Sequence, residues 1–136
     1  MTVLLDTNAA IGFINNDRRL QARFRAAQAR GDELAISTIA LFELWYGVAK
    51  SSRWEANARA LRAFLAFPVE IMPFDGHDAE AAGEVRASLE TAGTPIGAYD
   101  LLIAVHAVRR NAILITANTA EFSRVPGLQW EDWSAA

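Results

Sequence analysis

The chain has 136 residues, of which 52% are hydrophobic and 21% are charged, so it carries enough apolar material for one packed domain over residues 1–136. It contains no cysteine, which excludes disulfide bonds, thiol nucleophiles and zinc–thiolate sites. Its net charge of −3 gives no overall positive field for nucleic acid, so an RNA or DNA partner requires a local explanation. No apolar run reaches the roughly 18 to 20 residues of a membrane span and the N-terminus lacks a basic segment, so we expect a cytoplasmic protein without membrane attachment.

The first half of the chain alternates short apolar runs with helical patterns. Residues 3–5 are apolar throughout, which predicts a strand covered on both faces, as in a parallel sheet. Ser37 is a good N-cap for the apolar helix that follows it, and Pro68 ends another helix. The elements predicted after the first strand are helices at 9–14 and 17–30, a strand at 33–36, and helices at 38–50 and 54–67.

The second half continues the same alternation. Gly93 ends one predicted helix, and the loop at 94–97 leads into the next. The elements predicted here are a strand at 69–72, helices at 78–91 and 98–110, and strands at 112–115 and 128–130. Strands that alternate with helices indicate an α/β fold with a mainly parallel sheet.

Polar residues directly follow two of the predicted strands. Asp6 comes after the strand at 3–5, and the segment from Thr116 to Thr119 comes after the strand at 112–115. Ligands of open parallel sheets bind at the carboxyl ends of the strands, so we expect these two strand ends to face one cleft.

Two further carboxylates lie within apolar helices. The neighbours of Glu43 on its helix face are apolar or small, and the same is true of Asp100. Because an unpaired buried carboxylate is costly, we expect each to have a partner or a raised pKa, and the arginines of the chain could supply partners.

Each acid also has a simpler explanation. Asp6 could only cap the helix that begins near Asn8, and Asp100 could be a first-turn residue favoured by the helix dipole. Glu43 has the weakest explanation of this kind. Together the three acids favour a pocket neutralised by a hard divalent cation, Mg²⁺ or Mn²⁺, because the set offers only oxygen ligands.

The histidines and loops give little support to other chemistries. His106 is predicted to lie on a different helix face from Asp100, and His77 is in a loop. Neither has a Ser or Cys nucleophile at a recognisable spacing, and no nucleotide-binding glycine loop is present.

Four segments of the chain form a recognisable set. They are LLDTN at 4–8, STIALFE at 37–43, PIGAYDLLIAVHA at 95–107 and ITANTAEFSRVPGLQWEDW at 115–133. In this order and spacing they resemble the PIN-domain ribonucleases, specifically the VapC-type toxins of bacterial type II toxin–antitoxin pairs. The resemblance spans essentially the whole chain. It implies a three-layer α/β/α sandwich with a five-strand, mainly parallel sheet, a Mg²⁺-dependent endoribonuclease site, a homodimer and a cognate antitoxin protein.

The resemblance also implies roles for individual residues. Asp6 and Asp100 correspond to metal-ligating acids, and Glu43 corresponds to a further acid that ligates the metal or orients its water. The residues implied to support the site by hydrogen bonding are Thr7, Asn8 and Thr116. Asn118 stands where many PIN nucleases have a fourth acid, with Glu121 three residues on, so we expect one well-held ion and a second that arrives with substrate.

These observations predict an endoribonuclease toxin that hydrolyses RNA phosphodiesters with a metal-activated water. The alternative is a catalytically weak PIN-like module that binds RNA or a protein. Four aromatic residues, Trp45, Tyr46, Trp54 and Phe64, lie on two successive helices and could either pack in the core or form a dimer interface or antitoxin groove.

Overall fold

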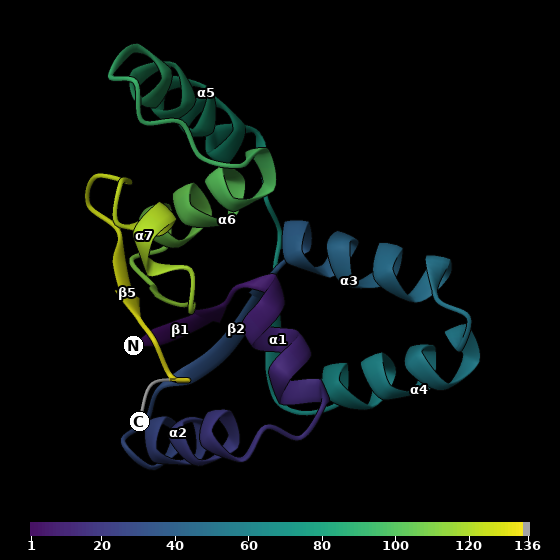
Figure 1. The fold of residues 1–136 in the computed structure, drawn as a ribbon. Helices are drawn as coiled ribbons and strands as arrows, with labels where there is room; N and C mark the ends of the chain where they lie inside the picture. Colours follow the sequence, from purple (N-terminus) through teal and green to yellow (C-terminus); the bar gives the residue numbers. More distant parts are fainter. Residues whose placement is uncertain (135–136) are drawn as a thin grey trace.

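The computed structural model describes residues 1–134, which form a five-stranded sheet and seven helices (Figure 1). The strand order is β3-β2-β1-β4-β5, and every pairing is parallel. The strands are β1 (Thr2–Leu5), β2 (Glu33–Ser37), β3 (Val69–Met72), β4 (Ile113–Ile115) and β5 (Gln129–Glu131). The helices are α1 (Thr7–Ile14), α2 (Arg18–Ala29), α3 (Thr38–Lys50), α4 (Trp54–Leu65), α5 (Gly76–Thr91), α6 (Ala98–Arg109) and α7 (Thr119–Phe122).

The register of the three central strands brings their carboxyl ends to one level. Leu5 of β1 lies opposite both Ile36 of β2 and Ile115 of β4. Asp6, Ser37 and Thr116 are the next residues along the chain, and all three are buried. The sheet therefore presents three polar side chains side by side at one edge, where α1 and α3 begin.

Helices cover both faces of the sheet. In Figure 1, α5, α6 and α7 lie on one side of the strands and α2 lies on the other. Helix α1 contacts α2, α3 and α4, while α5 packs on α6. Helix α3 also contacts α6, which links the two helix groups next to the polar edge of the sheet. Within residues 1–134, no helix combines the length and the apolar character needed to cross a bilayer.

The predicted fold class is confirmed, and the differences lie at element ends. Helix α1 begins at Thr7 because Asp6 is its N-cap, and α5 begins at Gly76 because Asp75 and Asp78 form a capping box. Helix α4 ends at Leu65, two residues before the predicted end, and residues 66 and 67 form the connection to Pro68. The short helix α7 was not predicted, because four residues are too few to show a helical period.

Candidate active site

Asp6 connects β1 to α1 and is 4% exposed. Its carboxylate accepts a hydrogen bond from the backbone N–H of Ala9 at 2.7 Å and one from the Thr116 side chain. Burial raises the pKa of Asp6, and the negative charges of Glu43 and Asp132 raise it further, while the two hydrogen bonds oppose the shift. Asp6 is therefore both a helix cap and an acid whose pKa is raised by burial and by neighbouring acids.

Glu43 lies on α3 and is half-buried. Its Oε1 accepts a hydrogen bond of 2.7 Å from the hydroxyl of Thr7, the first residue of α1. Glu43 also lines a groove of about 340 Å³ between α1, α3 and α4. Glu43 therefore has a partner, as expected. The partner is the neutral hydroxyl of Thr7, which does not compensate a negative charge on the carboxylate.

Asp100 lies in the first turn of α6 and is half-buried. Burial raises the pKa of Asp100 to about 6, and the charges of Glu121, Asp6 and Glu43 contribute in that order. The expectation of a raised pKa is therefore confirmed for Asp100. Mutual repulsion of this kind means that the four carboxylates share one region of the molecule.

Glu121 is the acid that sequence reasoning did not assign to the site. Its Oε1 accepts a hydrogen bond of 2.5 Å from the backbone N–H of Gly97, and its Oε2 accepts one of 2.8 Å from the amide of Asn118. These donors lower the pKa of Glu121, so it stays charged beside Asp100. Asn118 itself is exposed and donates to this carboxylate. The sequence did show an acid three residues beyond Asn118. Its contact with Gly97 depends on helix α7, which the sequence did not predict.

The residues implied to support the site differ in their environments. Thr7 bonds to Glu43, and Thr116 bonds to Asp6 while accepting the backbone N–H of Asn118 at 3.0 Å. Asn8 is exposed, and its side chain makes no hydrogen bond within residues 1–134. Its supporting role stays a prediction.

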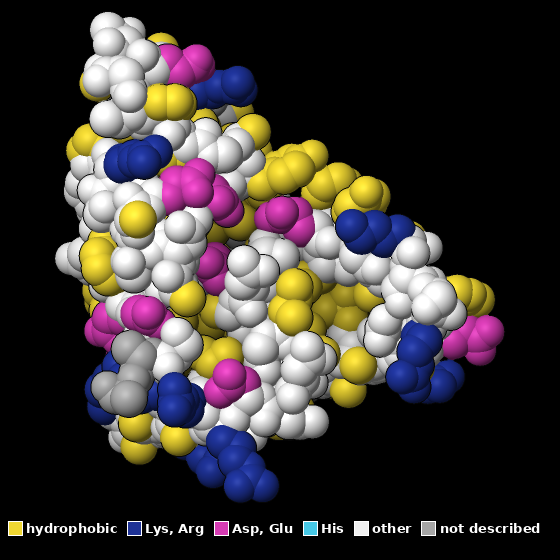
Figure 2. All heavy atoms as spheres, viewed as in Figure 1, with side chains coloured by type: hydrophobic (Ala, Val, Ile, Leu, Met, Phe, Trp, Pro, Cys, Tyr) yellow, Lys and Arg dark blue, Asp and Glu magenta, His cyan; other side chains and the backbone are white. Residues whose placement is uncertain are grey.

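Positive charge is kept away from this region. Figure 2 shows acidic side chains gathered around the hollow at the centre of this face, with lysine and arginine side chains toward its edges. In the described part of the chain no arginine forms an ion pair with Asp6, Glu43 or Asp100. Arginine, which the sequence left open as a partner, therefore does not pair with these three acids. Arg124 contributes to the lowered pKa of Glu121, but less than the hydrogen bonds from Gly97 and Asn118 do.

The donor chemistry fits a hard divalent cation. The four acids offer only oxygen atoms, and their repulsion would be relieved by a positive ion. Over residues 1–134 no three acidic, His or Cys side chains already stand close enough together to enclose an ion. The carboxylates would therefore have to move closer together to bind an ion.

His106 is buried away from these acids. Its Nδ1 lies 2.9 Å from the Ser37 hydroxyl, and its Nε2 lies 3.8 Å from Asp78. The three residue types of a hydrolase triad thus meet although their spacing gave no sign of it. All three are fully buried, and the Ser37 hydroxyl accepts the Ile39 backbone N–H, so Ser37 is not accessible as a nucleophile.

The four aromatic residues divide between the two predicted roles. Phe64 is in the core, and Trp45 is half-buried with the Arg62 guanidinium over its ring. Tyr46 and Trp54 are 58% and 56% exposed, respectively. Core packing therefore explains Phe64, and an exposed aromatic surface remains on α3 and α4.

Known proteins share both the fold and the sequence. The chain matches the family model of the PIN domain over residues 3–128, so it belongs to the PIN-domain family and has its fold. It is 39% identical over 131 residues to the "tRNA(fMet)-specific endonuclease VapC" of Salmonella typhimurium, with 96% of each chain covered. It is 41% identical over 133 residues to "Ribonuclease VapC2" of Rickettsia felis, with 98% of each covered.

A solved relative has the same architecture. The crystal structure of VapBC2 from Rickettsia felis bound to a promoter DNA fragment matches with a TM-score of 0.91 and 40% identity, covering 98% of this chain and 99% of that one. The chain therefore belongs to the VapC ribonucleases of the PIN-domain family, and the predicted resemblance is confirmed.

Proposed function

We propose that the protein is the toxin of a type II toxin–antitoxin pair and acts as a Mg²⁺-dependent endoribonuclease. One observation carries this proposal: Asp6, Glu43 and Asp100 repel one another without an ion pair to a cationic side chain of residues 1–134, and burial together with these charges and that of Glu121 raises the pKa of Asp100 to about 6. A folded protein tolerates such repulsion at a cost, and a divalent cation would remove it.

Each residue has a definite task in this proposal. Asp6 and Asp100 would hold the cation from the end of β1 and from α6, and Glu43 would either ligate it or orient the attacking water. When bound, Mg²⁺ would supply an acidified water and neutralise charge on the phosphate. The Thr7 hydroxyl fixes the Glu43 carboxylate for this role, and Thr116 fixes the carboxylate of Asp6. Glu121 adds negative charge beside Asp100 and supports a second ion that arrives with RNA.

The partners follow from the relatives and from the surface. The Rickettsia felis relative was solved as VapBC2, and we propose a cognate antitoxin for this chain too. The groove between α1, α3 and α4 includes Glu43, so a bound antitoxin segment would cover the active site. We further propose a cytoplasmic homodimer that uses part of the exposed aromatic surface of α3 and α4. Light scattering of the purified chain tests the dimer, and a monomer at high concentration would contradict it.

The substrate to test first is tRNA(fMet), because the Salmonella typhimurium relative is named for it. Antitoxin-free protein is incubated with tRNA(fMet) and with total cellular RNA, in Mg²⁺ or in chelator. We expect cuts at discrete sites in Mg²⁺ alone, leaving 5′-phosphate and 3′-hydroxyl ends. Asp100→Asn should lose at least about 100-fold in rate, and the exposed control Glu84→Gln should cut like the wild type.

Two outcomes would overturn the proposal. Cyclic phosphate ends would mean attack by the 2′-hydroxyl of RNA in place of water. A folded protein that cuts no RNA with any divalent cation would favour the alternative, a binding module of the same fold. Binding that does not weaken with salt would contradict recognition through phosphates.

A further inference from the structure

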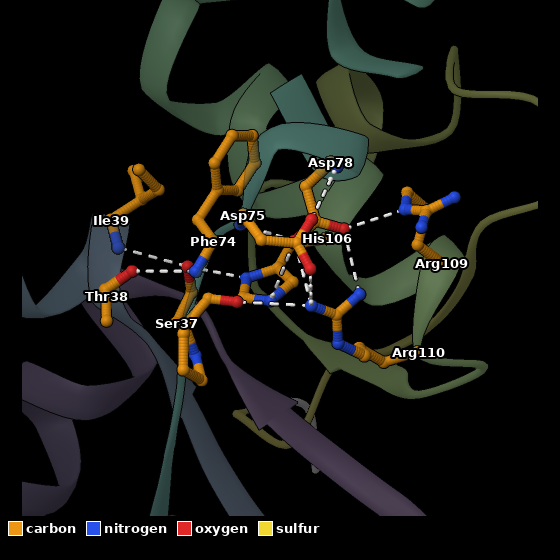
Figure 3. A network of polar contacts seen from close by, with 10 residues as sticks. Ser37, Thr38, Ile39, Phe74, Asp75, Asp78, His106, Arg109 and Arg110 are labelled. Atoms are coloured by element: carbon orange, nitrogen blue, oxygen red, sulfur yellow. Dashed lines mark hydrogen bonds and ion pairs between the residues drawn. The ribbon is translucent and has the colours of Figure 1, made fainter. Parts of the chain in front are cut away.

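A second polar cluster has three fully buried side chains at its centre. Its centre is His106 of α6, with Ser37 on one side of the imidazole and Asp78 on the other, as Figure 3 shows. All three side chains are 0% exposed. Arg109 and Arg110 close the cluster with hydrogen bonds of 2.7 and 2.8 Å to Asp78.

The imidazole of His106 makes a buried side-chain hydrogen bond to Ser37. The Ser37 Oγ accepts the backbone N–H of Ile39 at 3.1 Å, and the same hydroxyl can donate to Nδ1 of His106 or accept from it, according to the tautomer of the ring. Burial lowers the pKa of His106, so the ring is neutral. Its Nε2 has no hydrogen-bond partner among the described residues, since Asp78 lies too far away at 3.8 Å. Among the side chains of the described residues, Ser37 is therefore the hydrogen-bond partner of the ring.

Ser37 and His106 belong to two helices that carry acids of the active site. Ser37 is the N-cap of α3, and Glu43 follows six residues later on that helix. His106 comes six residues after Asp100 on α6. Each partner thus lies about 9 Å along the helix axis from its acid, at 1.5 Å per residue. The Ser37–His106 bond connects α3 to α6 at a point outside the site itself.

Neighbouring contacts stop the imidazole from turning. The ring of Phe74 meets the ring of His106 edge-on at 5.5 Å, and the Phe74 backbone N–H donates to the hydroxyl of Thr38 at 3.1 Å. The loop after β3 is thereby attached to the first residue of α3 as well. A polar group buried in this way adds little net stability compared with a packed apolar residue, so its effect is on orientation.

We propose that His106 is a positioning residue of the nuclease site, which sets through its bond to Ser37 the separation of the Glu43 and Asp100 carboxylates. This inference rests on the proposed function. The carboxylates must converge on an ion, and the distance that they have to travel depends on how α3 and α6 are held. Loss of the bond lets the helices shift, and metal binding then includes the cost of bringing them back.

The test compares variants that remove or keep the hydrogen bond. His106→Leu removes it, while His106→Asn places an amide group near the position of Nδ1 that can accept from the Ser37 hydroxyl or donate to it. Ser37→Gly removes the hydroxyl but keeps a residue that is tolerated at an N-cap, which provides a second route if the leucine variant does not fold. Calorimetry with Mn²⁺ alone gives the affinity, and cleavage assays give kcat and the half-saturating Mg²⁺ concentration.

We expect His106→Leu and Ser37→Gly to weaken Mn²⁺ binding on the order of 10-fold and to raise the half-saturating Mg²⁺ concentration in proportion. At saturating metal, kcat should recover most of its value. His106→Asn should stay close to the wild type in both measurements. The control is Leu20→Ala, a buried change in α2 away from the cluster, which should lower the melting temperature without changing metal affinity.

The outcomes separate this inference from the proposed function. If the wild type neither binds Mn²⁺ nor needs metal, the proposed function is wrong and the inference is overturned with it. If the wild type binds metal and folded His106→Leu or Ser37→Gly binds it equally well, only the positioning role is overturned. It is also overturned if Leu20→Ala loses affinity to the same extent, because the effect is then one of general stability.

Discussion

Asp78 and Asp100 are acids on neighbouring helices, and the protein treats them in opposite ways. Asp78 is fully buried, which by itself would raise its pKa. Hydrogen bonds from Arg110, the Asp75 backbone and Arg109 outweigh that effect and hold the pKa of Asp78 well below its usual range. Asp100 is only half-buried, yet burial raises its pKa to about 6, the charges of three other acids add to the rise, and within residues 1–134 no arginine forms an ion pair with it to oppose the shift. Local countercharge, more than depth of burial, therefore separates a structural acid from a functional one in this protein.

The same contrast indicates where the cation has to come from. The Asp78 cluster is neutralised by the chain itself, so it needs nothing from solvent. The acids of the candidate site have no arginine ion-pair partner for Asp6, Glu43 or Asp100 within residues 1–134. Their mutual repulsion therefore persists until a cation from solution binds. Four changes would break or sharpen this comparison, beginning with the one expected to have the largest effect.

Replacing Asp78 by alanine removes the acid that two arginines share. We expect Asp78→Ala to lower the free energy of unfolding by about 3 kcal/mol, the low end of the range for a broken buried ion pair, because both guanidinium groups partly reach solvent. Urea denaturation measures this change. The matched control is Glu90→Gln, which breaks the exposed pair with Arg86 and should cost less than about 0.5 kcal/mol. Equal losses in the two variants would contradict a special role for Asp78.

Replacing Asp100 by asparagine should have the opposite sign in metal-free protein. Asp100→Asn removes a repelled carboxylate, and we expect the free energy of unfolding at pH 7.5 to rise by about 1 kcal/mol after allowance for solvent screening. The same variant should lose the gain in melting temperature that Mn²⁺ or Mg²⁺ gives the wild type. A variant that is less stable without metal would mean that Asp100 has a favourable partner.

The pH dependence of stability should separate the two acids. The folded pKa of Asp100 lies near 6, above its ordinary value of 3.8, so its penalty is present above pH 6 and is relieved as the pH falls toward 4. The folded pKa of Asp78 is lowered, so its contribution is present above pH 4 and is lost as the pH falls further. Denaturation at a series of pH values measures the free energy of unfolding. Relief of the Asp100 penalty should raise this free energy in the wild type as the pH falls from 6 to 4, and this contribution should be missing in Asp100→Asn. An unchanged profile would contradict the raised pKa.

The smallest expected effect comes from Glu121. Glu121→Gln removes the largest charge contribution to the shift of Asp100, so the pKa of Asp100 should move from about 6 toward its ordinary value. Carboxyl ¹³C titration by NMR measures this directly. Glu84→Gln, on the exposed side of α5, should leave the titration of Asp100 unchanged. No shift in Glu121→Gln would place Glu121 outside the acidic site.

The sequence allowed much of the fold and part of the site to be predicted. The run from Val3 to Leu5 predicted a buried strand because its residues are apolar on both faces. Ser37 predicted the start of a helix because its hydroxyl can accept a free backbone N–H of the first turn. Asp100 gave a perturbed acid because its neighbours on the helix face are apolar. Each of these inferences uses interactions within a few residues, which is the range over which a pattern in one sequence carries information.

Interactions between distant segments were decided by the tertiary structure. Thr7 reaches Glu43, Glu121 reaches Gly97, and His106 reaches Ser37 across 69 positions of the chain. The sequence alone determined that three acids lie in apolar surroundings, two of them at strand or helix ends, and four segments in order indicated the family. Only the parallel register of β1, β2 and β4, together with the packing of α3 and α6, brought the acids to one region without an arginine partner within residues 1–134, since the position of a charge in space depends on how the strands align and the helices pack.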